Sequence, residues 1–193
     1  MYKIWLILFP ILFVFFSFVC NSGIAQSYDS LTLDYSTFFG ESLLGGIYEK
    51  QNKIVTDGQY FYLAKVVPVN SSVLPVTPGL RAKTPGNNTE VYVAKFDLEG
   101  NFIWGTFLGG GADEYLIFGE NFNTLTVEDG NVYIAGQTFS NDFQTTSNAI
   151  QLNKSGGNEA FVTKFDSNGN IVYSTYWGKL IGEAAYEIQV ENG

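Results

Sequence analysis

The sequence predicts an all-β protein of the β-propeller type, built from tandem four-stranded sheets. The first observation is a fixed period of 69 (164 − 95), because Lys95-Phe96-Asp97 recurs as Lys164-Phe165-Asp166. The second is a Ser/Gly-Thr-aromatic run that ends at Gly40, Gly109 and Gly178. The third is a composition of 17% aromatic residues and 21 glycines, which suits bulky sheet contacts and tight turns. A fixed period is typical of architectures in which each unit buries its apolar face against its neighbours.

Residues 1–25 are predicted to be a signal peptide. A basic start is followed by an apolar run from Ile4 to Cys20, and Gly23 and Ala25 supply the small residues of a cleavage site. Two other interpretations stay open. The apolar run is close to the length that spans a bilayer, so it could act as an uncleaved anchor. Lipid could be attached at Cys20, although the bulky residues before it disfavour this. We expect a secreted or cell-surface protein with no stable membrane span after signal cleavage.

Residues 26–193 are predicted to carry the β-propeller repeats. They contain no histidine, and the one cysteine, Cys20, belongs to the signal peptide. This excludes disulfides, thiolate nucleophiles, Ser-His-Asp relays and zinc or copper sites built on His or Cys. Acidic residues outnumber basic ones 19 to 10, without a run of like charge. We expect no nucleic-acid partner, because phosphates require clustered Lys and Arg.

Each unit is predicted to contain two β-hairpins and no helix. Runs rich in β-branched and aromatic residues alternate with turns that contain Asp, Asn and Gly. No stretch after the signal shows helical periodicity. Asp57 and Asp129 open two of the turns with a spacing of 72 (129 − 57), so loop lengths are expected to drift while strands keep their register. The predicted strands are 54–56, 60–64, 91–96, 102–108, 125–128, 132–136, 160–165 and 171–177.

Two stretches resemble the bacterial SBBP β-propeller repeat. One is 159–170 followed by 172–178, and the other is 130–138 followed by 142–146. The resemblance covers nearly all of the repeat region, and its motifs are fairly specific together but weak singly. The chain departs from the family pattern at Gln144, where members usually have proline. The resemblance implies a secreted or surface propeller with no established catalytic residues.

The third unit is expected to be incomplete. Val190-Glu191-Asn192-Gly193 matches Val127-Glu128-Asp129-Gly130, so the sequence is expected to stop inside a hairpin turn. About two and a half repeats are therefore present, whereas closed propellers have about four to eight blades. We expect an incomplete ring whose remaining blades come from a longer chain. The alternative is that several short chains assemble into one ring.

Acidic residues next to a glycine run are candidate catalytic groups. Asp113 and Glu114 follow Gly109-Gly110-Gly111, and Glu183 follows Glu114 at the same period of 69 (183 − 114). Paired carboxylates could serve as the acid and base of glycoside hydrolysis. Adjacent strand residues point to opposite faces, however, so solvated loop charges are the preferred interpretation. The glycine run lacks the Lys-Ser/Thr and following helix of a P-loop, and we interpret it as a flexible bend.

Asp166-Ser167-Asn168-Gly169-Asn170 resembles the start of a calcium loop. An EF-hand needs Gly and Glu where Ile171 and Trp177 stand, so a hairpin turn explains this segment better. We assign no metal ligand and no cofactor to the chain.

Four aromatic residues of the repeated runs could form a stacking platform for sugars. Their recurrence in the units instead favours packing between blades. Three sequons matter only if the host glycosylates secreted proteins. The aromatic residues are Trp104, Trp177, Tyr173 and Tyr176, and the sequons are at Asn70, Asn87 and Asn153.

The sequence therefore predicts a non-catalytic, extracytoplasmic repeat protein that acts as a scaffold or interaction module. Its ligand would be an unknown protein or glycan. The alternative is a carboxylate-dependent, carbohydrate-active enzyme on a propeller scaffold. No catalytic, cofactor-binding or metal residue is assigned.

Overall fold

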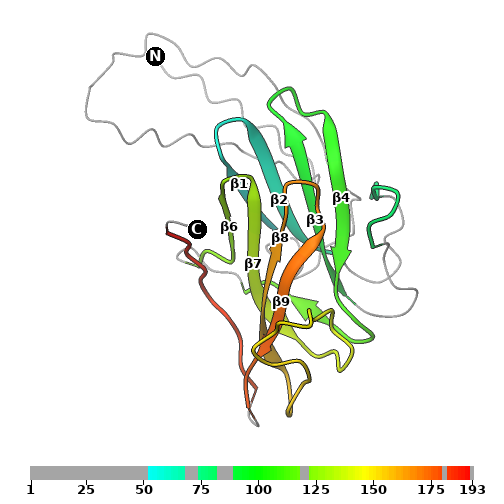
Figure 1. Ribbon diagram of the computed structural model, residues 1–193, viewed down its shortest axis with the longest axis vertical. Coiled ribbons are helices and arrows are strands. Elements are labelled where there is room, and N and C mark those ends of the chain that lie inside the picture. Colours follow the sequence, from blue (N-terminus) through cyan, green and yellow to red (C-terminus); the bar gives the residue numbers. More distant parts are fainter. Residues whose placement is uncertain (1–51, 68–73, 82–88, 118–121, 180–181, 192–193) are drawn as a thin grey trace, which may run out of the picture. The chain divides into compact units, whose positions relative to one another are not determined.

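The computed structural model describes residues 52–67, 74–81, 89–117, 122–179 and 182–191 (Figure 1). All of them lie in one compact part of the chain, Gly45–Gly193. The predicted signal peptide (1–25) lies outside the described residues, as do Gly40 and the sequons at Asn70 and Asn87.

The first sheet is an antiparallel meander in the order β1-β2-β3-β4 (Figure 1). Short turns join β1 to β2 and β3 to β4, as the Asp- and Gly-containing segments between the apolar runs predict, whereas the longer segment 68–89 joins β2 to β3. The strands are β1 (Asn52–Thr56), β2 (Tyr60–Val67), β3 (Glu90–Asp97) and β4 (Phe102–Leu108).

The second sheet repeats this meander and adds one short strand. Its main strands, β6 to β9, pair in sequence order, and β5 pairs with the far end of β7 beyond β6. Every predicted strand is present within a few residues of its expected bounds, and β5 was not predicted. The described residues contain no helix, so the all-β prediction is confirmed there. The strands are β5 (Glu114–Tyr115), β6 (Leu125–Glu128), β7 (Asn131–Thr138), β8 (Glu159–Phe165) and β9 (Ile171–Trp177).

The two sheets have the same strand register. Tyr62 faces Lys95 across β2 and β3, and Tyr133 faces Lys164 across β7 and β8. The Lys95 Nζ atom lies 5.4 Å from the Tyr62 ring centroid, and the Lys164 Nζ atom lies 4.9 Å from that of Tyr133. Directly after each lysine the pairing with the next strand shifts in register, which marks a β-bulge at the same place in both sheets. The sequence period therefore corresponds to a repeated structural unit.

The first hairpins of the two sheets can be superposed residue by residue. The difference in residue number between matching positions is one less than the sequence predicted. Tyr62 and Tyr133 hold the same register position with an offset of 71 (133 − 62), and β1 and β6 keep this offset. The alignment of Asp57 with Asp129, which has an offset of 72 (129 − 57), is therefore wrong by one position. It matched the two Asp-Gly dipeptides, whereas the strand pairing places Asp57-Gly58 one position earlier in its turn than Asp129-Gly130.

This shift changes the type of turn. Gly58 has a φ of 87° and Gln59 has no positive φ, which is the pattern of a type II′ turn with glycine at its first central position. Asp129 and Gly130 have φ values of 49° and 73°, and a type I′ turn requires positive φ at both central residues. Both turns match the right-handed twist of the flanking strands, so the hairpins close equally well with different sequences.

The Gly130→Ala substitution is expected to lower the free energy of unfolding by about 1 kcal/mol, because the left-handed conformation is costly for a residue with a Cβ. A Cβ there meets only the Ser167 Cβ at 3.7 Å, so backbone strain dominates. The matched control is Gly157→Ala, where the nearest atom is 3.8 Å away and no positive φ occurs. Urea unfolding measures both variants. Equal losses would show that the turn geometry does not limit stability.

A single apolar core joins the two sheets. Trp104 of β4 lies 6.4 Å from Phe165 of β8 between ring centroids, and its Nε1 donates to Ser167 O at 2.9 Å. Burial of such side chains is the main favourable term in folding. The core cluster comprises Tyr62, Ala64, Val66, Val91, Val93, Trp104, Leu108, Leu116, Leu125, Val132, Ile134, Phe143, Phe161, Phe165 and Tyr176.

Residues 182–191 follow β9 and contain no assigned strand. They nevertheless bond to the second unit, because Glu183 N donates to Asn158 O at 2.9 Å and Ile188 N donates to Asn123 O at 2.7 Å. The turn expected from the match of Val190–Gly193 with Val127–Gly130 would fall at 192–193, which lie outside the described part.

Candidate functional site

Glu114, the first residue of β5, is fully buried. Its carboxylate accepts hydrogen bonds from Thr138 Oγ1 at 2.7 Å, Ser140 Oγ at 2.5 Å and Gly110 N at 3.1 Å. The prediction that Glu114 is a solvated loop charge is therefore wrong. The short β5 pairing with β7 places Glu114 opposite Thr138 and carries its side chain into the protein interior.

The donors to Glu114 are themselves held in place. Ala112 N donates to Ser140 Oγ at 2.9 Å, and Ser140 N donates to Thr138 Oγ1 at 3.0 Å. Each hydroxyl is thus an acceptor for one backbone amide and a donor to the carboxylate. Networks of this kind strengthen each bond and fix the position of the buried group.

Burial raises the pKa of Glu114 to about 7. Loss of solvation, which disfavours the charged form, is the largest cause, and the nearby Glu90 carboxylate raises the pKa further. The bonds from Ser140, Thr138 and Gly110 act in the opposite direction. A carboxyl with a pKa near 7 could in principle transfer a proton at neutral pH. Glu114 has no exposed surface through which a substrate could reach it.

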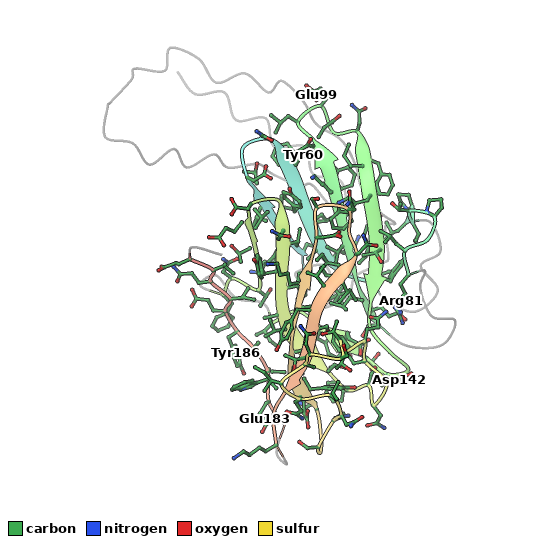
Figure 2. The ribbon with its side chains drawn as sticks, viewed as in Figure 1. Tyr60, Arg81, Glu99, Asp142, Glu183 and Tyr186 are labelled. Carbon is green, nitrogen blue, oxygen red and sulfur yellow. The ribbon has the colours of Figure 1, made fainter. Side chains whose placement is uncertain are left out.

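Glu90 at the start of β3 is a second fully buried carboxylate at this junction. Arg81 binds it through two nitrogens, with Nη1 3.0 Å from Oε2 and Nη2 3.4 Å from Oε1. The Arg81 side chain remains partly exposed. A buried charge requires a partner, and Arg81 supplies one for the negative charge of Glu90 at the edge of the site. Figure 2 shows Arg81 toward the end of the sheets at which Asp142 lies, away from Glu99.

Gly109 packs directly against both carboxylates. A Cβ at this position would clash with Glu114 Oε2 and would lie 3.0 Å from Glu90 Cγ. Glycine is needed here because the backbone and the two buried side chains approach each other closely. In the described part of the chain, the glycines that close these runs, Gly109 and Gly178, therefore make room for a carboxylate side chain.

The amides of the glycine run are bonded to side chains. Gly109 N donates to Gln144 Oε1 at 3.1 Å, and Gly111 N donates to Asp142 Oδ1 at 2.7 Å. Gly110 N donates to Glu114. The segment expected to be a flexible bend is thus held by three side-chain acceptors. The same bonds occupy the N–H groups that a phosphate cradle would present.

Asp113 bonds to the first unit instead of to Glu114. Its Oδ1 accepts from Thr89 N at 2.8 Å and from Thr89 Oγ1 at 3.0 Å. Its backbone carbonyl accepts from Phe139 N at 2.9 Å. Asp113 therefore links Thr89, which precedes β3, to the loop that follows β7. The acid–base pair considered for Asp113 and Glu114 is replaced by two separate structural contacts.

The same arrangement recurs at Glu183, one sequence period after Glu114. Glu183 N donates to Asn158 O at 2.9 Å, as Glu114 N donates to Thr89 O at 3.0 Å. Each carboxylate accepts the backbone N–H four positions before it, at 3.1 Å in both cases. Glu159, the counterpart of Glu90, is also fully buried. One oxygen of Glu183, Oε2, is buried and has no hydrogen-bond partner among the described residues.

The aromatic candidates divide into two groups. Trp104 and Tyr176 are buried, and Tyr176 Oη donates to Ser140 O and accepts from Phe143 N, both at 2.9 Å. Both are therefore core residues; Trp104 contacts the other sheet, whereas these contacts of Tyr176 lie within the second unit. Trp177 is 58% exposed, so the prediction that it packs between blades is wrong. Tyr173 is partly exposed.

The segment 166–170 forms the turn between β8 and β9, as predicted. Asp166 Oδ1 accepts from the amides of Asn168 and Asn170 at 2.9 Å, and Gly169 has a φ of 86°. These bonds lower the pKa of Asp166 against the opposing effect of burial. Asn153, the one sequon in the described part of the chain, is exposed. No cluster of three His, Cys, Asp or Glu residues suited to a metal is found within that part.

Sequence reasoning missed several residues of this site, among them Glu90, Thr138, Ser140 and Glu159. The spacing of 69 from Glu90 to Glu159 (159 − 90) was available as a signal, because both precede the repeated β3 and β8 motif. The hydroxyl donors could not be found in this way, since only the pairing of β5 with β7 brings them to Glu114.

The chain matches no protein-family model, and no curated protein shows significant similarity to it. The part of the chain that the structure describes includes no helix long and apolar enough to cross a membrane.

Proposed function

We propose that this protein is a non-catalytic, extracytoplasmic β-propeller segment of the SBBP type that serves as a scaffold or interaction module. The observation that carries this proposal is that Glu114 has a structural role, because its carboxylate is buried and hydrogen-bonded inside the protein. Its three donors come from the glycine bend, β7 and the following loop, and its backbone bonds to Thr89 of the first unit. The carboxylate best suited to catalysis thus lies at the junction between units and has no exposed surface.

Three further observations support the proposal. Two successive meanders share one register, which is how tandem blades are built. The signal-like residues 1–25 favour export of the chain. The acidic surface without a cationic cluster favours a protein or glycan ligand over nucleic acid. The remaining blades of a ring would come from a longer chain.

The alternative function, a carboxylate-dependent and carbohydrate-active enzyme, rests on the pKa of Glu114, which is raised to about 7. General acids of glycosidases have raised pKa values of this kind. A second carboxylate would have to face the same substrate, but Asp113 bonds to Thr89 and Glu90 to Arg81.

A glycan panel separates the two functions. We expect the exported chain, with an intact mass that begins at Gln26, to release no reducing sugar above the buffer control. Hydrolysis that disappears in Glu114→Gln and in Asp113→Asn, while both variants keep the wild-type urea midpoint, would establish the enzyme and overturn the scaffold. Glu187→Gln, an exposed glutamate, is the matched control. A mass that retains residues 1–25 would contradict cleavage.

A further inference from the structure

The turn between β8 and β9 contains an asparagine followed by a glycine, Asn168-Gly169. Asn168 is exposed, and its side-chain amide makes no hydrogen bond within the described residues, although its backbone N–H donates to Asp166 Oδ1 at 2.9 Å. Asparagine is a thermolabile residue, and a following glycine has no side chain to hinder attack by its nitrogen on the asparagine amide carbon. The pair therefore has the chemistry of a deamidation site.

Packing in this turn requires Gly169 but does not require Asn168. Gly169 has a φ of 86°, and a Cβ on it would lie 2.8 Å from the Trp104 ring. The equivalent turn of the first sheet has the same backbone bonds and a glycine with a φ of 82°, Gly100. Glu99 precedes that glycine (Figure 2), so the same turn forms without asparagine.

The attacking nitrogen is occupied while the turn is closed. Gly169 N donates to Asp166 O at 3.0 Å. Trp104 of the first sheet holds this arrangement, because its ring packs on Gly169 and its Nε1 donates to Ser167 O at 2.9 Å. The turn must therefore open away from Trp104 before the nitrogen can reach the Asn168 side chain. The free energy of such a local opening is set by the contacts that it breaks.

We propose that Asn168 is a covalent modification site whose reaction is controlled by the contact between the two sheets. In the open turn, Gly169 N loses its proton to base and attacks Asn168 Cγ, which expels ammonia and leaves a cyclic succinimide. Water then opens the ring at either carbonyl and gives aspartate or isoaspartate. The net reaction consumes water and releases ammonia, without oxidation or reduction. This inference is independent of the proposed function.

The isoaspartate product changes the contact that controls the reaction. It adds a methylene group to the main chain beside Gly169, which is buried and already packs tightly against Trp104. The longer turn cannot keep both the bond to Asp166 O and the packing of Trp104. The modified chain is therefore expected to hold its two sheets together less tightly, and the loss of ammonia makes the change one-way.

The test incubates the full chain in mildly alkaline buffer and follows Asn168 by peptide mapping with electron-transfer fragmentation, which separates aspartate from isoaspartate. A synthetic peptide of residues 164–172 gives the rate in the absence of the fold. We expect the chain to react roughly tenfold more slowly than the peptide, the factor that one protecting hydrogen bond provides. Mapping also separates this site from the other Asn-Gly pair, Asn192-Gly193.

Variants of the contact test its control over the reaction. Trp104→Phe keeps a ring but loses the bond to Ser167 O, so the rate should rise toward that of the peptide. Trp177→Ala, at an exposed tryptophan, should leave the rate unchanged. Asn168→Glu, which copies the first sheet, should not react.

The consequence of the modification is measured on the isoaspartate form, isolated by chromatography. It should unfold at a lower urea concentration than the unmodified chain. Asn168→Asp is the matched control, because it has the same charge without the added methylene group and should keep the wild-type midpoint.

An Asn168 that stays intact in both the wild type and Trp104→Phe, while the peptide reacts, would overturn the proposal. Equal rates in the wild-type chain and the peptide would also overturn it, because the contact would then provide no control. An isoaspartate form with the wild-type urea midpoint would do the same, since the modification would then not reach the contact between the sheets.

Discussion

The Trp104→Ala substitution is expected to lower the free energy of unfolding by about 4 kcal/mol, the cost of removing a buried tryptophan from a packed core. Trp104 is 2% exposed and donates to Ser167 O. A Cβ built on Gly169 would lie 2.8 Å from the Trp104 ring, which shows how closely the turn of the second sheet packs on it. Alanine would leave a cavity between the sheets and an unpaired carbonyl.

Trp177→Ala is the matched control, because Trp177 is 58% exposed and lies on the uncovered counterpart of the same surface. Its loss should change the free energy of unfolding by no more than about 0.5 kcal/mol. Urea unfolding with circular dichroism measures both variants. Equal effects would contradict the assignment of Trp104 as the residue that joins the two sheets. Trp104→Phe should fall between them, since it keeps the ring contact and loses the hydrogen bond.

The strands of this protein could be predicted from sequence because their signals are local. Alternating β-branched and aromatic residues mark β2, β3 and β8, and Asp-Gly dipeptides mark the turns. Which residues occupy the two central positions of each turn could not be predicted. Asp57-Gly58 and Asp129-Gly130 look identical, but positive φ falls on Gly58 alone in one turn and on both Asp129 and Gly130 in the other.

The site was beyond sequence reasoning because it depends on a contact between distant segments. Glu114 and Asp113 stand side by side in a polar loop, and most such residues are solvated. A two-residue strand, β5, is too short to show a periodicity, yet its pairing with β7 buries Glu114 beneath Thr138 and Ser140. The glycine spacing was read as a repeat signal, and the structure adds its reason, which is room for a carboxylate.

Stability is expected to fall by about 3 kcal/mol as the pH rises from about 4.5 to above 7, through Glu114 alone. Burial raises its pKa from 4.5 in the unfolded chain to about 7 in the native state. The native state therefore holds the proton more tightly. The resulting stabilisation is fully present below pH 4.5 and is lost as the pH passes through 7. Asp57 and Asp166, whose pKa values are lowered, act in the opposite direction only as the pH falls below their ordinary value of 3.8.

Urea unfolding of the wild type and Glu114→Gln between pH 4.5 and 8 isolates this effect, because glutamine does not titrate. The wild type should lose about 3 kcal/mol relative to the variant across this range, and Glu187→Gln should run parallel to the wild type. Parallel curves for Glu114→Gln would mean that the donors Thr138, Ser140 and Gly110 keep the carboxylate charged throughout. In that case hydrogen bonding outweighs burial, and the junction between units is held by an anion and not by a neutral acid.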